Sequence, residues 1–386
     1  MTVASHGLTS TWWRTADVLA RRRDRLRAKL DERQLAGCLV TSDSDRTWLS
    51  GFGATSNDTV PAAVMLVGCD RDVLFTSANN VDWAASEAPG LDVVAWKRPW
   101  WTALASEIVA TGWPTIGFDP DHLSVRAFDT LMEVIETGAG FMELGGGVAE
   151  LRAVKDDAEI RTLRRAVEIT DLAFHEATNR LTDGTTEREL AGRLDSAMRR
   201  HGASDPGFPT IVASGSNAAR PHHSPTDRPI LSGEPVIIDM GARFDGYTAD
   251  LTRTIWVGDA HPRLAEIFAV VSEANRVAQK AVRPGVTGRE VDSAARGVIQ
   301  HAGFGDAFIH GLGHGVGLDI HEAPSAGQQS NDTLVAGNTL TIEPGIYLPG
   351  WGGVRIEDMG VVTEVGFDCL TGARKASPRR TDSPTS

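Results

Sequence analysis

The chain has 386 residues, of which 41% are hydrophobic and 23% are charged, and its formal net charge is −13. That length exceeds one ordinary core, so we expect two domains, and the negative charge argues against nucleic acid or an anionic membrane as a partner. The three cysteines are few and widely spaced, and the chain shows neither an apolar leader nor an apolar run of about 18 residues, so it is expected to be a cytoplasmic protein without a disulfide framework or membrane span.

The first part of the chain predicts a small α/β domain. Residues 1–18 are assigned to an N-terminal extension and residues 19–148 to the domain itself. Short apolar runs that are typical of strands occur at 37–42, 62–68, 72–77 and 115–120. Helical patterns occur at 101–112 and 124–138. Strands and helices that alternate in this way favour an α/β layer structure.

A Gly-Gly-Gly run at 145–147 ends this domain, and residues 149–371 are assigned to a second one. A long amphipathic helix opens the second domain, with Asp156 or Asp157 as its N-cap. The apolar positions placed near one face of this helix are Ile160, Leu163, Val167 and Leu172. Residues 372–386 are polar, basic and rich in Pro and Ser, which predicts a disordered tail.

The second domain contains an internal repeat. A block that starts at Gly184 resembles one that starts at Gly285, 101 residues later, and a second pair of blocks aligns at an offset of 104. The second alignment places Asp239 on Glu343. Two aligned blocks in the same order favour duplication over chance. A duplication predicts a pseudo-twofold domain with a central antiparallel sheet and a site between its halves.

The first repeat contains a predicted hairpin with two carboxylates. Asp245-Gly246 is a strong signal for a two-residue turn, which sets Asp239 opposite Thr252. Because side chains alternate along a strand, Asp250 shares a face with Thr252. Asp239 and Asp250 are then diagonal neighbours within reach of a common ion.

The second repeat contains a matching hairpin centred near Gly350, and a symmetric turn there sets Glu343 opposite Glu357. One face of this hairpin is expected to be apolar, with Leu340, Ile342, Val354 and Ile356. The other face is expected to be polar, with Thr341, Glu343, Arg355 and Glu357.

Four carboxylates on the inward faces of apolar strands need compensation, because like charges facing one another destabilise a sheet and buried unpaired carboxylates are costly. Solvated acids on surface hairpins are the alternative, but the sequences VIID and LTIE are too apolar for that. One divalent cation, or two, would relieve the repulsion, and carboxylates that bridge two metals would make a site for metal-assisted hydrolysis. A hard ligand set of carboxylates with one imidazole suits Mn²⁺ and would accept Co²⁺ or Zn²⁺.

The imidazole comes from the stretch HGLGHGVGLDIHE, residues 310–322, which contains His310, His314 and His321. A histidine pair four residues apart suggests a zinc site on a helix. Glycines alternate through the same window, however, and each costs a helix about 1 kcal/mol relative to alanine. We therefore expect an extended or looped segment with its backbone close to another part of the chain. A glycine-rich surface loop with incidental histidines is the alternative.

At these residues the sequence resembles the metallopeptidase family with the pita-bread fold, which includes methionine aminopeptidase, aminopeptidase P and prolidase. The resemblance covers residues from about 20 to 370 and rests on Asp239, Asp250, His314 in GHGVGL, Glu343 in EPG and Glu357 in RIED, in the family's order. It implies an α+β chain, in which a pita-bread catalytic domain follows a smaller, ribonuclease H-like α/β domain of the creatinase type. Methionine aminopeptidases lack that first domain, which disfavours their activity here.

The resemblance implies a ligand set for two divalent ions. Asp239 and Asp250 would bind one metal, His314 and Glu343 would bind the other, and Asp250 and Glu357 would bridge the two.

The resemblance also implies roles in catalysis. The proline-specific branch has a histidine 17 residues before the first aspartate ligand, which is His222 here, with His223 as its rival. This histidine would contact substrate or move protons. His321 matches a second catalytic histidine that donates a hydrogen bond to the scissile carbonyl or its oxyanion. Glu343 is expected to carry a proton toward the leaving nitrogen.

Three further residues are expected near the site. His310 resembles a contact to substrate, and a structural histidine near the site is an equal alternative. Arg355 is expected to orient the metal-binding carboxylates. Tyr347 is placed either near the site or in the core.

The implied activity is hydrolysis of Xaa-Pro bonds in small peptides, of the prolidase or aminopeptidase P type, by a homodimer. A metal-using non-peptidase of the same fold is the alternative, acting on a small amide or related metabolite like ectoine hydrolase or a lyase. A metal-free, creatinase-like mechanism and an inactive binding module are disfavoured, because all five ligands and His321 are present.

Overall fold

The computed structural model describes residues 12–56, 61–135 and 139–375, and the chain divides into two compact units, Met1–Arg152 and Ala153–Ser386. Most of the predicted N-terminal extension (1–11) and most of the predicted tail (376–386) lie outside the described residues.

The first unit is built on a six-stranded sheet with the strand order β4-β3-β2-β1-β5-β6. Its strands are β1 (Gly37–Val40), β2 (Ala63–Gly68), β3 (Asp72–Thr76), β4 (Asp92–Ala95), β5 (Thr115–Phe118) and β6 (Gly140–Glu143). β2 pairs antiparallel with both neighbours, and the other pairs are parallel. The four apolar runs singled out in the sequence correspond to β1, β2, β3 and β5, so the predicted α/β character of this unit is confirmed.

The helices of the first unit are α1 (Ala16–Glu32), α2 (Asp43–Ser50), α3 (Val81–Glu87), α4 (Trp100–Thr111) and α5 (Val125–Ile135), with α6 (Ala149–Ala153) at the boundary between the units. α4 and α5 correspond to the two predicted helices. α1 begins within the stretch assigned to the extension, where the Thr15 hydroxyl accepts a hydrogen bond from the backbone N–H of Val18. That N-cap satisfies a donor that the first turn would otherwise leave free.

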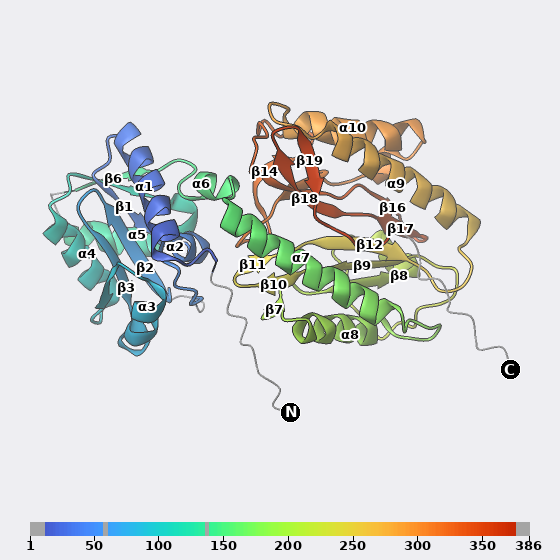
Figure 1. The fold of residues 1–386 in the computed structure, drawn as a ribbon, viewed down its shortest axis with the longest axis horizontal. Helices are drawn as coiled ribbons and strands as arrows, with labels where there is room; N and C mark the ends of the chain where they lie inside the picture. The colour runs from blue at the N-terminus through green and yellow to red at the C-terminus, as the bar shows by residue number, and fades with distance from the viewer. Residues whose placement is uncertain (1–11, 57–60, 136–138, 376–386) are drawn as a thin grey trace. The chain divides into compact units, whose positions relative to one another are not determined.

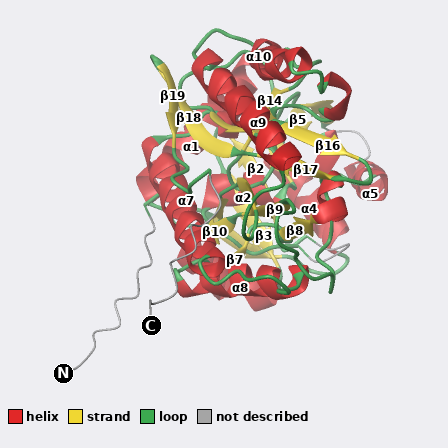
Figure 2. Ribbon diagram, turned by 90° about the vertical axis from the view of Figure 1, so that its right-hand side faces the viewer, coloured by secondary structure: helices red, strands yellow, loops and turns green. Residues whose placement is uncertain are grey.

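Two pairs of helices enclose the strands of the second unit (Figure 1). The first pair is α7 (Asp157–Thr178) and α8 (Glu187–Arg200), and the second pair is α9 (Pro262–Ala281) and α10 (Gly288–His301). In Figure 1 α8 lies below the strands, and α9 and α10 lie above them. Figure 2 shows α9 and α10 packed side by side.

Helix caps in the second unit confirm the repeat. Asp156 is the N-cap of α7 and forms a capping box with Glu159. Thr186 caps α8 with Glu189, and Thr287 caps α10 in the same way with Glu290, so both helices start at positions that the offset of 101 predicts.

One residue predicted for the buried face of α7 lies on the opposite side. Leu163 and Val167 are buried, but Leu172 is 42% exposed. Leu172 follows Leu163 by nine residues, which is about two and a half turns of a helix. The prediction for Leu172 was therefore wrong, and Ala173 and Phe174 occupy the buried face instead.

The strands of the second unit pair antiparallel. Those of the first half are β7 (Asp205–Pro206), β8 (Ile211–Ser214), β9 (Val236–Met240), β10 (Ala242–Phe244), β11 (Tyr247–Thr248) and β12 (Leu251–Ile255). Those of the second half are β13 (Gly313–Gly315), β14 (Glu322–Ala326), β15 (Thr339–Ile342), β16 (Gly345–Leu348), β17 (Gly352–Arg355), β18 (Asp358–Thr363) and β19 (Gly366–Cys369).

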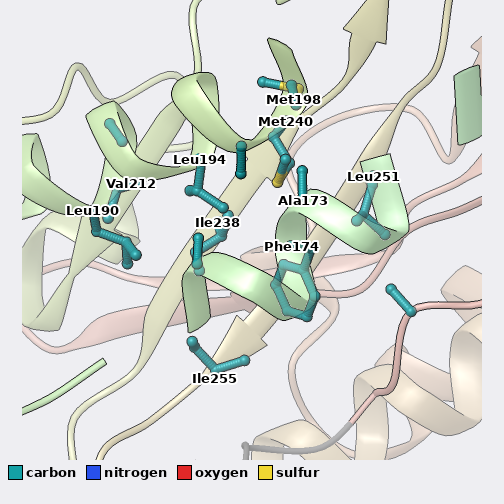
Figure 3. Close-up of a cluster of buried hydrophobic side chains, with 14 of the residues drawn as sticks. Ala173, Phe174, Leu190, Leu194, Met198, Val212, Ile238, Met240, Leu251 and Ile255 are labelled. Carbon is teal, nitrogen blue, oxygen red and sulfur yellow. The ribbon is translucent and has the colours of Figure 1, made fainter. Parts of the chain in front are cut away.

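Each half of the repeat has a hydrophobic core of its own. In the first half, side chains from α7, α8, β8, β9 and β12 converge (Figure 3), among them Phe174, Leu194, Ile238 and Leu251. In the second half, α9 and α10 contribute Val271 and Ile299 to a separate cluster with strands β15 and β17. Two cores on either side of the strands are what the predicted pseudo-twofold domain requires.

The chain continues beyond β19 in contact with the second unit. Ala373 is 5% exposed and belongs to the core of the first half. Residues 372–375, which were assigned to the tail, are thus part of the packed structure. Among the described residues, the helices lack the length and apolar character needed to cross a membrane.

Candidate active site

The residues selected from the sequence meet in one cavity of about 510 Å³ in the second unit. Its wall includes His222, Asp239, Asp250, His310, His314, His321, Glu343, Arg355 and Glu357. The rival histidine, His223, lies in the same wall.

The first hairpin presents Asp239 and Asp250 to this cavity. β9 and β12 pair with Asp239 opposite Thr252, which confirms the register predicted from the turn. Asp245 and Gly246 have φ values of 48° and 87°, the left-handed backbone that a two-residue turn needs. Asp250 directly precedes β12 and is only 5% exposed.

The second hairpin keeps one register but is interrupted at its carboxylates. β15 pairs with β18 so that Ile342 is opposite Asp358, and β16 pairs with β17 in the same register. That register sets Glu343 opposite Glu357, as predicted, in the gap between the two ladders. The face turned away from the cavity is apolar, as predicted, with Leu340, Ile342, Val354 and Ile356 in the core of the second half.

Thr252 joins the two hairpins at the site. Its carbonyl oxygen accepts a hydrogen bond from the Glu357 backbone N–H at 3.0 Å. Its hydroxyl donates to Glu357 Oε2 at 2.8 Å and accepts from Arg355 Nε at 3.1 Å. Sequence reasoning used Thr252 only as a register position, whereas in the structure it fixes a carboxylate from the other half of the repeat.

The segment with His314 is extended, as predicted. β13 pairs with β14, and a Cβ atom at Gly313 would lie 2.0 Å from the carbonyl oxygen of Thr341. Glycine therefore lets β13 lie directly against β15. The close approach brings His314 Nε2 to 3.4 Å from Glu343 Oε1 and 3.6 Å from Asp250 Oδ2.

Arg355 lies at the centre of a buried hydrogen-bond network beside the carboxylates. Its Nη2 donates to Asp239 Oδ2 at 2.7 Å, and its Nη1 donates to the Tyr347 hydroxyl at 2.9 Å. His310 Nε2 lies 2.9 Å from the same hydroxyl, and His310 Nδ1 lies 2.7 Å from the Gly311 carbonyl oxygen. Burial lowers the pKa of His310, which favours the neutral ring. In that ring Nδ1 carries the proton that it donates to the carbonyl oxygen, so Nε2 accepts from Tyr347. Tyr347 is both buried and part of the site's network.

Burial and mutual repulsion set the charges of the site. Burial, followed by the charge of the facing carboxylate neighbours, raises the pKa of Asp250 and of Glu357 well above the ordinary values. Burial alone would also raise the pKa of Glu343, but the hydrogen bond and charge of His314 lower it to about 2. Burial likewise opposes the charged form of His314, and Glu343 outweighs burial and raises the pKa of His314 to about 9.

The donor set fits divalent cations. Ligand atoms of Asp250, His314 and Glu357 lie within 4.8 Å of one another. Asp239 Oδ1 is buried and has no hydrogen-bond partner among the residues that the structure describes. Such an oxygen is costly unless a cation or another donor meets it. Carboxylate oxygens with one imidazole are suitable ligands for divalent first-row metals.

Two more histidines approach this centre from separate segments. The rings of His321 and His314 are 4.3 Å apart in an edge-to-face arrangement. His222 is exposed toward solvent, whereas the neighbouring His223 is 8% exposed and its Nε2 lies 2.9 Å from Glu187 Oε2. His223 is thus engaged within the protein, and His222 has the accessible imidazole.

Glu187 was missed by the sequence analysis. Its side chain is fully buried at the start of α8. It accepts hydrogen bonds from the backbone and side chains of the segment that precedes and follows His222, namely from Ser214, Asn217, His223 and Thr226. The sequence marks Glu187 only as an acidic residue in the first turn of a helix, so nothing in it signals this long-range role.

The fold and the site together define a pita-bread protein with a centre for divalent cations. Residues 161–364 match the model of metallopeptidase family M24, and residues 22–154 match the creatinase/prolidase N-terminal domain. The chain belongs to metallopeptidase family M24, which implies divalent metal ions at this centre.

The chain is similar to proteins named Xaa-Pro dipeptidase or X-Pro aminopeptidase. It is 45% identical over 231 residues to an Xaa-Pro dipeptidase of Pyrococcus furiosus, an alignment that covers 60% of this chain and 66% of the relative. The structure of an Xaa-Pro dipeptidase from Bacillus anthracis has a TM-score of 0.87 and 34% identity, and the match covers 93% of this chain and 100% of that one. The structure of an X-Pro aminopeptidase from Thermotoga maritima has a TM-score of 0.83 and 31% identity, with 92% and 99% covered.

The first prediction concerns Glu187. Burial opposes its charged form, but hydrogen bonds from Thr226, Asn217 and other neighbours lower the pKa of Glu187 from 4.5 to about 2. A carboxylate with a lowered pKa stabilises the fold above its unfolded-state pKa, and this stabilisation is lost as the pH falls toward 2. We expect Glu187→Gln to lower the free energy of unfolding by about 3 kcal/mol at neutral pH, and the difference from the wild type to shrink below about pH 4.5.

Urea unfolding of the chelated protein at several pH values measures this difference. Glu189→Gln is the matched control, because a glutamine retains the capping box of the same helix. A Glu187→Gln effect that stays constant down to about pH 2.5 would show that the charge of Glu187 does not stabilise the fold.

The second prediction concerns protons at the metal centre. In the protein without ions, His314 has a pKa of about 9 and holds a proton at neutral pH, and the raised pKa values of Asp250 and Glu357 keep these carboxyls protonated to a higher pH than usual. As metal ligands, all three would bind a cation only in their deprotonated forms. We expect Mn²⁺ to release protons on binding, and its affinity to increase from about pH 6 to about pH 8. Calorimetric titration in buffers with different ionisation enthalpies measures the release, and a binding heat that is the same in every buffer would contradict it.

Proposed function

We propose that the chain hydrolyses Xaa-Pro peptide bonds in small peptides, as a prolidase or an aminopeptidase P. The observation that carries this proposal is the meeting of four carboxylates and His314 in one cavity of a chain that belongs to family M24. Relatives named Xaa-Pro dipeptidase and X-Pro aminopeptidase support the choice of substrate.

The proposed ligands form a dinuclear site. Asp239 and Asp250 would hold one ion, His314 and Glu343 would hold the other, and Asp250 and Glu357 would be shared between them. When bound, the ions supply a nucleophile from water near neutral pH and polarise the carbonyl group. Mn²⁺ is our choice of metal, because oxygen donors dominate the set, and Co²⁺ or Zn²⁺ would also be accepted.

The surrounding residues orient the ligands and move protons. Arg355 holds Asp239 at 2.7 Å, so this carboxylate keeps one oxygen for the arginine and has the other, Oδ1, available for an ion. His321 donates a hydrogen bond to the oxyanion that forms at the scissile carbonyl. Glu343 takes up the proton that the attacking water releases and delivers it to the leaving nitrogen, which must be protonated before the proline departs as an amine.

The rest of the cavity wall suits a short peptide. Phe208, Ile211 and Ile320 contribute apolar side chains to the cavity wall. His222, which is exposed in the same wall, is placed to contact the substrate. His310, in the same wall, is proposed to contact the substrate, with its ring oriented by the hydrogen bond from Tyr347. The nitrogen of an Xaa-Pro bond carries no hydrogen, so an enzyme that acts on the carbonyl loses no contact with this substrate.

We further propose a cytoplasmic homodimer. Cys69 and Cys369 are exposed free thiols, which are compatible with a reducing compartment. The dimer is proposed from the resemblance of the sequence to its family. Light scattering coupled to size-exclusion chromatography measures the assembly directly, and a monomer at micromolar concentration would contradict it.

Hydrolysis assays test the proposed activity and decide between its two forms. With Mn²⁺ present we expect cleavage of an Xaa-Pro dipeptide, an Xaa-Pro-Yaa tripeptide, or both, and we expect activity to disappear after thorough chelation and to return with added metal. Preference for the dipeptide identifies a prolidase, and preference for the tripeptide identifies an aminopeptidase P. Equal activity after chelation would refute the metal-dependent mechanism. Cleavage of neither peptide by metal-loaded protein would favour a non-peptidase of the same fold, acting on a small amide.

A further inference from the structure

The second hairpin has a break in its hydrogen-bond ladder beside the two glutamates. Its register sets Pro344 opposite Ile356, and the Ile356 N–H lies 3.4 Å from the Pro344 carbonyl oxygen. A hydrogen-bonded antiparallel pair normally exchanges two such bonds. Proline has no N–H, so Pro344 cannot return the bond to the carbonyl oxygen of Ile356.

A side chain from α9 supplies the missing donor. Asn275 is fully buried, and its Nδ2 donates to the Ile356 carbonyl oxygen at 3.3 Å and to the Ile342 carbonyl oxygen at 2.8 Å. These carbonyls belong to the residues that directly precede Glu357 and Glu343. β15 and β17 are not paired with each other in a ladder. One amide therefore connects the last residue of β15 with the residue that follows β17, immediately next to both glutamates.

The orientation of this amide is itself fixed. Asn275 Oδ1 accepts hydrogen bonds from Gln279 Nε2 at 2.8 Å and from Lys375 Nζ at 2.7 Å. Two donors on one side and two carbonyl oxygens on the other leave the amide a single favourable orientation. Gln279 and Lys375 both also contact the carboxylate of Asp358, which directly follows Glu357.

The first half of the repeat provides an internal comparison. At the repeat offset of 101, the counterpart of Asn275 is Phe174, which lies in the hydrophobic core. At the offset of 104, the counterpart of Pro344 is Met240, which pairs with Leu251 in a continuous ladder. Buried pairs that support the offset of 101 for these helices are Leu163 and Leu264, Ala173 and Ala274, and Ala177 and Ala278. The half whose strand contains proline thus has a buried amide on the helix. The half whose strand has a backbone N–H at that position has an apolar side chain there instead.

We propose that Asn275 is a positioning residue, which replaces the donor that Pro344 lacks and thereby holds Glu343 and Glu357 at the separation that binds cations. This inference rests on the proposed function, because it takes both glutamates as metal ligands. Asn275 itself lies outside the cavity wall and acts through the strand backbones.

The affinity of the chelated protein for Mn²⁺, measured by calorimetry well below the unfolding temperature, tests the proposal. Asn275→Leu keeps a similar side-chain volume and removes the hydrogen bonds to the carbonyl oxygens of Ile342 and Ile356. We expect it to weaken Mn²⁺ binding by about tenfold or more, as the loss of a group that orients metal ligands does. Asn338→Leu is the matched control: Asn338 is 3% exposed and its Nδ2 donates to the Ala153 carbonyl oxygen at 2.9 Å. The control should lose stability and keep the wild-type affinity.

A second variant separates positioning from general destabilisation. Pro344→Ala restores an N–H opposite Ile356, so in that background Asn275→Leu should weaken Mn²⁺ binding much less than it does alone. Should Asn275→Leu not fold, Asn275→Ser gives the same comparison.

Wild-type affinity in Asn275→Leu, an equal loss in Asn338→Leu, or an undiminished effect in the Pro344→Ala background would overturn the role of Asn275. A wild-type protein that binds neither Mn²⁺, Co²⁺ nor Zn²⁺ would instead overturn the proposed function.

Discussion

Repulsion among four carboxylates held in one cavity is the constraint on which the second unit depends. Asp239, Asp250, Glu343 and Glu357 come from two hairpins whose other faces are packed in hydrophobic cores, so the strands cannot turn these side chains toward solvent. Without cations, the raised pKa values of Asp250 and Glu357 favour their uncharged forms, and the positive charges of Arg355 and His314 offset part of the remaining repulsion. Divalent cations relieve it more completely, because they meet several oxygens at once. Bound cations would therefore both reduce the repulsion that destabilises the fold and provide the chemistry proposed for the site.

Duplication explains how this cluster is assembled, and departures from symmetry explain how it is made functional. Both halves contain a capped helix, a long helix and a hairpin. Each half then acquires its own support. In the first, Glu187 fixes the segment that carries His222, whereas its counterpart at the offset of 101 is Gly288, where a Cβ atom would lie 2.0 Å from the Ser325 carbonyl oxygen. In the second, Asn275 connects the two strands that carry the glutamates.

Much of the site could be predicted because the alternation of side chains and the type of turn, both set by neighbouring residues, determine which residues face one another in a hairpin. The alternation of side chains and one Asp-Gly turn were enough to set Asp239 opposite Thr252, and the same reasoning set Glu343 opposite Glu357. Alternating glycines correctly excluded a helix around His314. The prediction of the buried face of α7 was less accurate, since Leu172 is nine residues from Leu163 and lies on the opposite, exposed side of the helix. Glu187 and Asn275 could not be found in this way, because their partners are distant in the chain and a buried acid or amide has no periodic signature.

We infer that the carboxylates and His314 hold two divalent ions, with Asp250 shared between them. The number of Mn²⁺ ions bound per chain, measured in the wild type and in Asp250→Ala by metal analysis after equilibrium dialysis, tests it most directly. We expect two ions for the wild type and at most one for Asp250→Ala, with loss of peptidase activity. Two ions bound to Asp250→Ala with wild-type affinity would contradict it.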